Sequence, residues 1–476
     1  MQEQAVPVKQ PLLSDAQRQA IHEGALRLLE RVGLAVDSES LRRQLARHAG
    51  VRLSEGRVCF EGQLLEELLA RPDPLPWRPA RDERVQLSGG CCASHIVDPE
   101  TDTIRPILWA DLAEATRLFD AMQSDDVSGH APGFPQDVPP PMQALAEYLI
   151  GCLYGRAGGS FTAPCPLAAY EYYWRMCEVM GVAFSLPLYI ISPLRLMGDS
   201  LEAILHYLPM VRKYSVSSMP VMGATAPIFL PAAFIQALAE SFAGLAVLKL
   251  LRPDAEVHWG MMVFPLDMKY GSIVYGSPEM NLADMFRLEM EAFYGREGGS
   301  TRSIRSMSKR PDAQACIERA GSAVAGVLMG SRSFFGAGML SVDEVFSPEM
   351  LVMDREIADY AGRFARGIDL SAEAMDIGTI GKGALAGDFM GLDSTLAHFR
   401  EAYWLPRLME RRMLSGWLAG DQGNIRSRAR QEIKRYLLAY DFELAPEKAR
   451  ALWAIYREAA QAIVGGTGLP EGVAEV

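Results

Sequence analysis

Short apolar runs and longer stretches with helical periodicity alternate along most of this chain. Near the N-terminus, Ile21, Ala25 and Leu28 recur at helical spacing, which predicts an amphipathic helix that ends at Gly33. After Trp109, each short apolar run is followed by a helical pattern, as in residues 231–251, 278–294 and 312–329. The pattern predicts strands that alternate with helices.

Eight apolar runs are candidate strands, at residues 127–130, 160–164, 188–192, 216–222, 256–262, 272–275, 301–306 and 333–336. Eight strands that alternate with helices favour an α/β fold with a closed (β/α)₈ barrel, the TIM-barrel arrangement, over an open doubly wound sheet. No GxGxxG motif follows a strand, which argues against a dinucleotide site.

The chain divides into three expected parts. Residues 1–108 combine helical patterns with a hairpin-like stretch around Glu55-Gly56, which predicts an α+β cap. Residues 109–346 hold the candidate strands and form the expected barrel core. Residues 347–476 are mainly helical in pattern and are expected to pack on the barrel.

Composition narrows the class of protein. The chain has 476 residues, of which 49% are hydrophobic, and a formal net charge of -12. The negative charge argues against nucleic acid and against an anionic membrane surface as partners. No apolar run reaches the roughly 20 residues that a membrane span needs. Seven cysteines without a CxxC pair, and a polar N-terminus, predict a reducing, cytoplasmic location.

A cluster of cationic residues follows the candidate strand at 301–306. It comprises Arg302, Arg305, Lys309 and Arg310, in an otherwise acidic chain. Residues at the C-terminal ends of barrel strands line the mouth where such enzymes keep their chemistry. The same cluster is also compatible with a solvated basic loop, because charge runs often lie on solvated faces.

Aromatic residues are frequent at the predicted strand ends, namely Phe161, Trp259, Tyr275, Phe334 and Phe335. Aromatic rings beside a carboxylate such as Glu279 suit a quaternary ammonium group, which donates no N–H hydrogen bond and is held by cation–π attraction. The alternative is that these rings fill the interior of the barrel.

Three residues are candidates for catalytic roles: Glu279, His130 at a strand end, and Lys309 in the cationic cluster. The seven histidines form no HxH or HExxH cluster, and Cys91, Cys92 and His95 are a weak zinc candidate, so we expect no metal ion of the protein's own. No P-loop or GxSxG motif is present.

Several motifs together resemble one family. They are Gly223-Ala-Thr-Ala-Pro227 with Glu240 in the next helix, Tyr275-Gly-Ser-Pro-Glu279, Pro311-Asp-Ala-Gln-Ala315 with Glu318, Ser347-Pro-Glu-Met-Leu-Val352, and Pro406-Arg-Leu-Met-Glu-Arg411. In order and spacing, from about Leu12 to Tyr440, the chain resembles the trimethylamine methyltransferase (MttB-like) family. The usual His-Thr pair of that family is Ser394-Thr395 here.

The resemblance implies a TIM barrel that moves a methyl group from a methylated amine to the Co(I) of a separate corrinoid protein. The trimethylamine enzymes carry pyrrolysine just before the Pro-Asp-x-Gln-Ala motif, where this chain reads Ser306-Met307-Ser308-Lys309. The chain therefore resembles the branch without pyrrolysine, whose members act on quaternary amines such as glycine betaine.

Under this resemblance, the five aromatic residues supply members of a cage, Glu279 contributes charge, and Arg302 or Arg305 pairs with a substrate carboxylate. The expected partners are a corrinoid protein, which carries the cobalamin cofactor, and a small quaternary amine. Apolar helices outside the barrel suggest a homodimer. The alternatives are another methyl donor, such as a tertiary amine or a sulfonium, and a protein that binds quaternary amines without transferring methyl groups.

Overall fold

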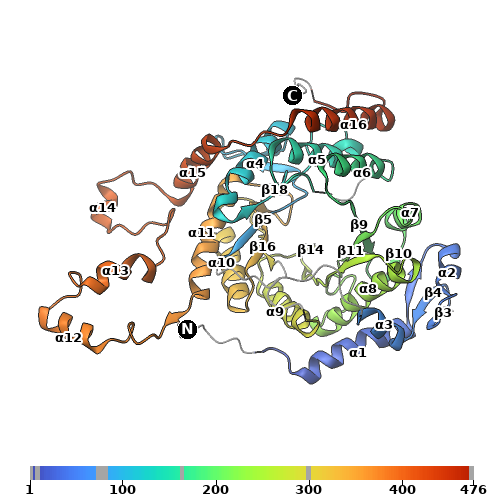
Figure 1. The fold of residues 1–476 in the computed structure, drawn as a ribbon, viewed down its shortest axis with the longest axis horizontal. Coiled ribbons are helices and arrows are strands. Elements are labelled where there is room, and N and C mark those ends of the chain that lie inside the picture. Colours follow the sequence, from blue (N-terminus) through green and yellow to red (C-terminus); the bar gives the residue numbers. More distant parts are fainter. Residues whose placement is uncertain (1–3, 6–10, 71–83, 161–165, 296–301, 471–476) are drawn as a thin grey trace.

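The computed structural model describes residues 4–5, 11–70, 84–160, 166–295 and 302–470. Its body is a mixed α/β structure with two parallel sheets, and an arm of residues 367–424 extends to one side (Figure 1). Most of the buried apolar side chains belong to one continuous core that runs through the body. The candidate site lies at one end of the parallel strands.

The first parallel sheet has four strands in the order β15-β16-β5-β8. They are β5 (Gln86–Gly89), β8 (Val127–Ser128), β15 (Arg302–Ser303) and β16 (Ser333–Ala337). Strand β5 pairs in parallel with both β16 and β8, so it lies inside this sheet. The parallel sheet thus begins before residue 109, where the sequence pattern places the start of the barrel core.

The second parallel sheet consists of β9 (Ser185–Ile190), β11 (Lys213–Ser218) and β12 (Glu256–Trp259), with β11 in the middle. A hydrogen-bonded pair at Val221 and Phe264 continues the parallel alignment beyond β11 and β12. Within the described residues, the two sheets are separate and do not close into one barrel.

Two of the expected barrel strands differ from the structure or lie outside it. Strand β14 (Ser272–Ile273) pairs antiparallel with β13 (Leu266–Asp267), so residues 272–275 belong to a hairpin and not to a parallel sheet. A short apolar run beside a turn has the same local pattern in both settings, which explains the misassignment. Most of the expected strand at 160–164 lies outside the described residues.

Helix α8 (Leu230–Leu251) is the central helix of the second sheet, and it lies against β9, β11 and β12. It has 22 residues and a mean hydropathy of 1.6, so it is long and apolar enough to cross a membrane, contrary to the sequence-based expectation. However, 78% of its apolar window is buried inside the protein. Helix α1 (Asp15–Arg31) covers α8 on the side away from the sheet (Figure 1).

The N-terminal part contains α2 (Glu39–Leu45), α3 (Gly62–Leu69) and a small sheet. That sheet comprises β2 (Leu34–Val36), β3 (Val51–Ser54), β4 (Arg57–Phe60) and β10 (Arg195–Leu196), in the order β10-β2-β4-β3. Strand β10 follows β9 in the chain, so the body of the protein supplies one edge of this N-terminal sheet.

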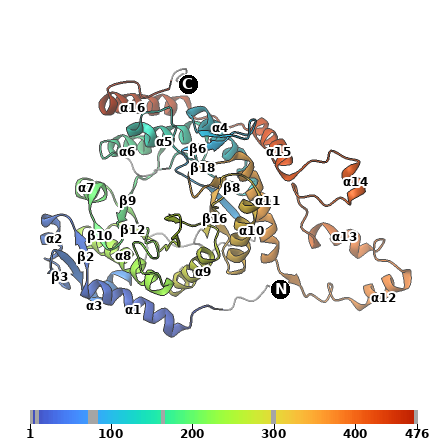
Figure 2. The ribbon, with the colours of Figure 1, turned by 180° about the vertical axis from the view of Figure 1, so that it is seen from behind.

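The remaining helices of the body pack around the two parallel sheets (Figures 1 and 2). They are α4 (Trp109–Ala121), α5 (Gln143–Tyr154), α6 (Ala169–Met180), α7 (Gly198–Tyr207), α9 (Pro278–Phe293), α10 (Ala313–Leu328), α11 (Pro348–Ala365), α15 (Ile425–Ala439) and α16 (Pro446–Val464). Helices α15 and α16 return after the arm, and they lie against α4 and α11, and against α5 and α6, respectively.

A further small sheet in the order β17-β18-β6-β7 lies next to the first parallel sheet (Figure 2). Its strands are β6 (His95–Val97), β7 (Ile104–Pro106), β17 (Met339–Leu340) and β18 (Val345–Phe346). The turn between β17 and β18 carries Asp343, and the loop between β5 and β6 carries Cys91 and Cys92. These two connections bring residues beside the ends of β15 and β16.

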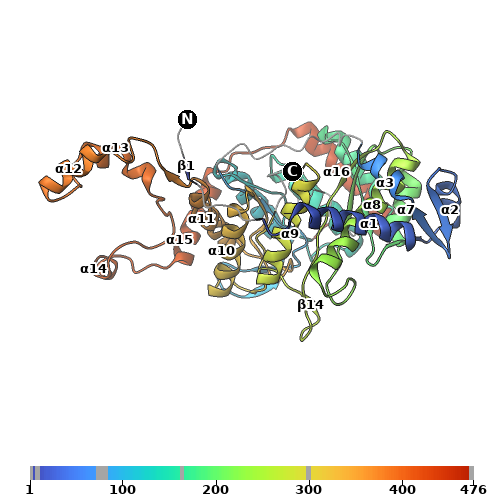
Figure 3. The same cartoon turned by 90° about the horizontal axis from the view of Figure 1, so that it is seen from below.

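The arm contains α12 (Ile377–Ala386), α13 (Asp393–Ala402) and α14 (Leu414–Leu418), and in two perpendicular views it projects away from the body (Figures 1 and 3). At its root, β19 (Ile368–Asp369) pairs antiparallel with β1 (Gln4–Ala5). The sequence pattern predicts helices here, and the structure has them, but they do not pack on the body as α15 and α16 do.

Candidate functional site

Arg305 is the centre of a polar cluster just past β15. Its side chain is nearly buried, and its Nε lies 2.5 Å from Oδ1 of Asp343. Its Nη1 donates a hydrogen bond of 2.8 Å to the hydroxyl oxygen of Tyr275. The cluster therefore holds a cation that is already paired with a carboxylate.

Two aromatic rings flank the guanidinium of Arg305. Its central carbon lies 5.0 Å from the centroid of the Tyr275 ring and 4.6 Å from that of the Phe335 ring. At these distances the negative face of a ring attracts a cation. The structure thus builds, from Tyr275, Phe335 and Asp343, a place that stabilises positive charge.

Burial sets the protonation behaviour of these groups. Burial raises the pKa of Asp343, although the neighbouring Arg305 opposes the shift. Burial also raises the pKa of Tyr275 to about 12, so the phenol stays protonated at neutral pH. For Arg305, burial works against the charged form, but Tyr275 and Asp343 raise its pKa overall. The pair is therefore a buried guanidinium beside a carboxyl that is costly to ionise.

The position of Asp343 is fixed by its own turn. The Ser341 N–H donates a 2.7 Å hydrogen bond to the carbonyl of Ser308, and the Val342 N–H donates one of 3.1 Å to that of Ser306. Ser341 and Val342 have φ angles of 50° and 68°, a left-handed conformation that is unfavourable for a β-branched residue. Such strain persists only where the surroundings impose it, and here it presents Asp343 to Arg305.

The two candidate arginines have different settings. Arg302 belongs to β15 (Arg302–Ser303), whereas Arg305 lies just past the end of that strand. Arg302 pairs with Phe334 across β15 and β16, and both are buried. Arg302 Nη2 donates a 3.0 Å hydrogen bond to Glu291 of α9. A Cβ added at Gly326 of α10 would lie 2.8 Å from the ring of Phe334. Both side chains therefore pack toward the helices.

The other predicted aromatic residues do not join the Arg305 cluster. Trp259 is buried in the main core, with its ring against those of Phe242 and Tyr294. Phe161 lies outside the described residues. Of the five predicted cage members, the structure brings Tyr275 and Phe335 together around one cation.

The three candidate catalytic residues belong to three different segments of the chain. Glu279 is exposed in the first turn of α9, where a carboxylate complements the positive end of the helix. Lys309 is exposed, and its Nζ donates a 2.8 Å hydrogen bond to the carbonyl of Met307. His130 Nδ1 lies 3.0 Å from the carbonyl oxygen of Ala131, and burial lowers the pKa of this histidine. Their catalytic roles stay predictions.

The site includes residues that the sequence did not single out. Asp343 stands in a turn sequence with no motif around it, and only the meeting of two loops places it beside Arg305. The Sγ atoms of Cys91 and Cys92 are 3.4 Å apart, and both Arg305 and Asp343 lie close enough to influence the Cys91 thiol. Among the described residues, no group of three histidine, cysteine or acidic side chains is arranged to hold a metal ion.

A model of the trimethylamine methyltransferase (MTTB) family matches residues 182–460, more than half of the chain. The chain belongs to this family. The match covers Tyr275, Arg305, Phe335 and Asp343, so the whole Arg305 cluster lies within the family region.

Curated MTTB relatives differ in how much of the chain they match. MttB of Desulfitobacterium hafniense is 27% identical over 92% of this chain and 91% of its own length. The glycine betaine methyltransferase of the same species is 25% identical over 91% and 93%, respectively. MttB of Methanosarcina thermophila is 28% identical over 55% of this chain and 56% of its own, so the chain spans about half the length of this relative.

Among solved structures, a monomethylamine methyltransferase of Methanosarcina barkeri covers 90% of this chain and 95% of its own. The sequence identity is 12% and the TM-score is 0.43. A likeness at this level carries no argument about the site.

One of the MTTB motifs has a structural role. Glu240 of α8 is fully buried, and its carboxylate accepts hydrogen bonds from Ser192 Oγ (2.8 Å), the Leu194 N–H (3.1 Å) and Gln236 Nε2 (2.9 Å). Burial raises the pKa of Glu240, although these hydrogen bonds oppose the shift. The residue fixes the loop that follows β9 and so shapes the same end of the sheets as Arg305.

A second family motif follows the Arg305 loop. Oε2 of Glu318 accepts a 2.8 Å hydrogen bond from the Met307 N–H, and Oδ1 of Asp312 accepts one of 2.9 Å from the Ser308 hydroxyl. The motif Pro311-Asp-Ala-Gln-Ala315 with Glu318 thus holds the segment after Arg305 in place. Its residues position the site without entering it.

Proposed function

We propose that this protein is a methyltransferase that moves a methyl group from a small quaternary amine with a carboxylate, such as glycine betaine, to a corrinoid protein. Membership of the MTTB family supports the reaction class. The glycine betaine methyltransferase among the relatives supports the substrate class, because it matches the chain over most of its length. The observation that carries the proposal is the pairing of Arg305 with Asp343 between two aromatic rings.

A zwitterionic substrate matches this pair. A betaine carries one carboxylate and one quaternary ammonium, so it can replace the internal ion pair with two new ones. Its carboxylate would bind Arg305 through two charge-assisted hydrogen bonds. Its ammonium would lie against Asp343 and the rings of Tyr275 and Phe335. Net charge at the buried site would not change, whereas a lone cation would add an uncompensated charge next to Arg305.

The chemistry asks little of the protein as an acid or base. Methyl transfer from a quaternary ammonium releases a neutral tertiary amine, so no proton is needed at the leaving group. The reduced corrinoid of the partner protein supplies a strong nucleophile as the methyl acceptor. The residues of this chain would bind the two charged ends of the amine, remove water from it and aim one methyl group outward.

A closed (β/α)₈ barrel is the arrangement we propose for the two parallel sheets. The edge strands of the first sheet are β15 and β8, and those of the second are β9 and β12. Along the chain β8 is followed by β9, and β12 precedes β15, so each edge of one sheet has a counterpart edge in the other. If the intervening segments bridge the gaps, the sheets form one barrel with Arg305 at the C-terminal end of its strands. We also propose that the protein acts in the cytoplasm, since its cysteine usage suits a reducing compartment.

The visible spectrum of a reduced corrinoid protein, mixed with this enzyme, tests the function. We expect the Co(I) absorption to disappear with glycine betaine, proline betaine or carnitine, and to persist without enzyme. Loss of the absorption only with a tertiary amine or a sulfonium would favour another donor. Calorimetric binding of a betaine without any spectral change would instead indicate a binding protein and overturn the proposed reaction.

A further inference from the structure

The arm, residues 367–424, exposes far more apolar surface than its length predicts. Sixteen of the 38 large apolar side chains exposed in the described part of the chain lie in it. From residue 368 to 407, the only buried residue is Gly383. Each of these sixteen side chains is at least 37% exposed. The arm has no core of its own.

The arm is nevertheless folded. The carboxylate of Asp376 caps α12, because it accepts 2.9 Å hydrogen bonds from the N–H groups of both Gly378 and Thr379. The ring of Phe389 lies directly over Gly383, and His398 Nε2 lies 3.2 Å from Oε1 of Glu373. A helix that is capped but has no buried face within its own chain is expected where its apolar side chains pack against another molecule.

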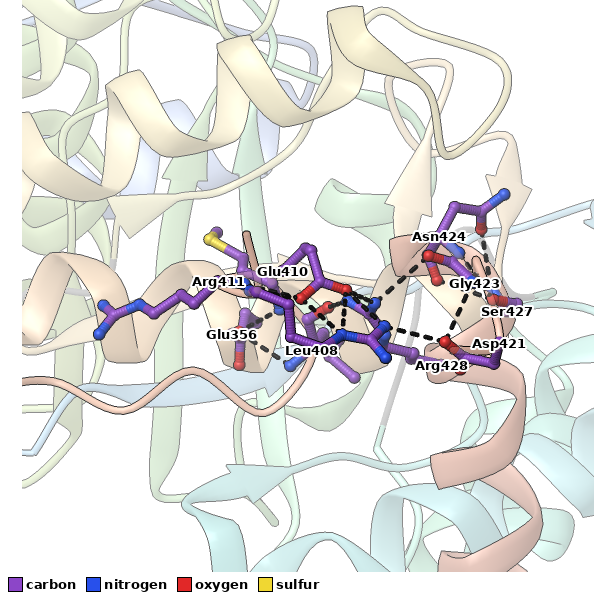
Figure 4. Close-up of polar contacts among 11 residues, drawn as sticks. Glu356, Leu408, Glu410, Arg411, Asp421, Gly423, Asn424, Ser427 and Arg428 are labelled. Carbon is purple, nitrogen blue, oxygen red and sulfur yellow. Dashed lines mark hydrogen bonds and ion pairs between the residues drawn. The ribbon is translucent and has the colours of Figure 1, made fainter. Parts of the chain in front are cut away.

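Residues 407–410, between α13 and α14, attach the arm to the body. Glu356 of α11 is buried, and its carboxylate accepts hydrogen bonds from the backbone N–H groups of Arg407, Leu408 and Met409 at 3.0–3.1 Å (Figure 4). Glu410 binds Arg428 of α15, so the returning chain is held at a second point (Figure 4). This attachment gives the arm a defined direction.

Helix α13 presents an apolar face with regular helical spacing. Leu396 and Phe399 lie three residues apart in α13, which places them on one side of the helix, and Leu392 and Tyr403 flank its two ends at intervals of four residues. Leu396, Phe399 and Tyr403 are 62%, 40% and 66% exposed. This is the pattern of a helix that packs against a partner.

We propose that a second copy of this chain covers the arm, so that two chains form a dimer by exchanging their arms. Permanent homodimer interfaces bury roughly 2,000–5,000 Å² in total and are more hydrophobic than transient ones, which suits a segment with sixteen exposed large apolar side chains. A partner that comes and goes would leave this surface in water between encounters, whereas another copy is always present at the same concentration.

Charge along the arm supports the same occupant. Residues 367–424 carry eight acidic side chains and five basic ones, so the arm is acidic overall. Helices that lie on membranes are rich in lysine and arginine, so an anionic bilayer is disfavoured.

The mass of the full-length protein in solution, measured by analytical ultracentrifugation, tests this proposal. We expect two chains of 52.3 kDa each for the wild type at micromolar concentration. Replacing Leu396 on the arm, as Leu396→Glu, should weaken the dimer by roughly thirtyfold or more, since it would bury a charge in the interface. The matched control is Leu438→Glu, at an 89% exposed leucine of α15 outside the arm, which should leave the dimer intact.

Hydrogen exchange of the wild-type arm gives a readout that needs no variant. Amides of α12 and α13 should exchange slowly at high protein concentration and faster on dilution, with the rest of the chain unchanged. A wild-type monomer would overturn the proposal, including one that binds lipid vesicles or acquires arm protection only with a corrinoid protein. A dimer that Leu396→Glu leaves intact, in a variant with wild-type circular dichroism, would also overturn it.

Discussion

The nearly buried side chain of Arg305 makes three kinds of contact. Its guanidinium is paired with Asp343, bonded to the phenol of Tyr275 and placed over the ring of Phe335. Arg302, three positions earlier, makes its contacts with α9. The two residues look equivalent in the sequence, but Arg302 lies in β15 and contacts Glu291 of α9, whereas Arg305 lies past the strand and contacts Asp343.

Removing the charge of Arg305 should affect carboxylated substrates selectively. For Arg305→Gln, we expect the KM for glycine betaine to rise roughly tenfold to hundredfold, because two charge-assisted hydrogen bonds are lost. Arg310→Gln is the matched control, since Arg310 follows on the same loop and lies 3.3 Å from Asp102 instead. Steady-state kinetics of both variants check this, and an equal rise for both would argue against the anchoring role.

Packing between helix and sheet is close where α8 crosses β11. A Cβ at Gly244 of α8 would overlap a methyl group of Val216, and both residues belong to the core region. Glycine is therefore required at this crossing, although it lowers the intrinsic helix propensity of α8. The sequence shows only a glycine inside a helical pattern, which has several explanations.

Filling this contact should destabilise the protein. Gly244→Val is expected to lower the free energy of unfolding by about 1–3 kcal/mol, because the extra atoms force the helix away from the sheet. Gly321→Ala, in α10, is the control: the added Cβ would meet only Asn281 Nδ2, at 4.0 Å. It should be neutral or stabilise by roughly 0.5–1 kcal/mol. Chemical denaturation of both variants distinguishes packing from helix propensity.

The hairpin of β6 and β7 depends on one carboxylate. Asp98 accepts hydrogen bonds from the N–H groups of Glu100 (3.0 Å) and Thr101 (2.9 Å), and its other oxygen accepts one from Arg105 (2.9 Å). The Thr101 N–H and Arg105 lower the pKa of Asp98 to about 2. A carboxyl with a lowered pKa in the folded state stabilises the protein above its unfolded pKa, near 4, and loses that effect as the pH falls toward 2.

Asp98→Ala should therefore be less stable than wild type at pH values above about 4. At pH 7 we expect a loss of about 1–2 kcal/mol in the free energy of unfolding, from the missing hydrogen bonds. The difference from wild type should shrink as the pH falls below about 4. Denaturation at several pH values measures it, with Glu100→Ala as a control at an exposed neighbour. A difference that is constant with pH would contradict the role of the ionised carboxylate.

At the scale of the whole molecule, strands from distant parts of the sequence pair within the same sheet. Strand β5 lies between β8 and β16, so the first parallel sheet needs residues from before position 109. The N-terminal sheet in turn borrows β10 from the body. The two parts are interlocked and do not form a separate cap and core.

A truncated chain tests this interlocking. We expect the fragment 109–476 to be unfolded or insoluble, because it lacks a central strand of the parallel sheet and α1, which covers α8. The fragment 11–476 should fold, since it keeps both. Circular dichroism and melting curves of the two fragments provide the comparison. A cooperative transition in 109–476 would show that the residues before 109 are an independent part.

The sequence by itself determined the family and most helices, because motif order and apolar periodicity are local properties that a chain carries wherever it folds. It also indicated Tyr275, Arg305 and Phe335. Only the tertiary structure decided that Asp343 pairs with Arg305 and that Arg302 contacts α9 instead. It also decided that residues 272–273 form an antiparallel hairpin strand and that the apolar side chains of the arm stay exposed. These depend on pairings between distant segments, which local patterns do not specify.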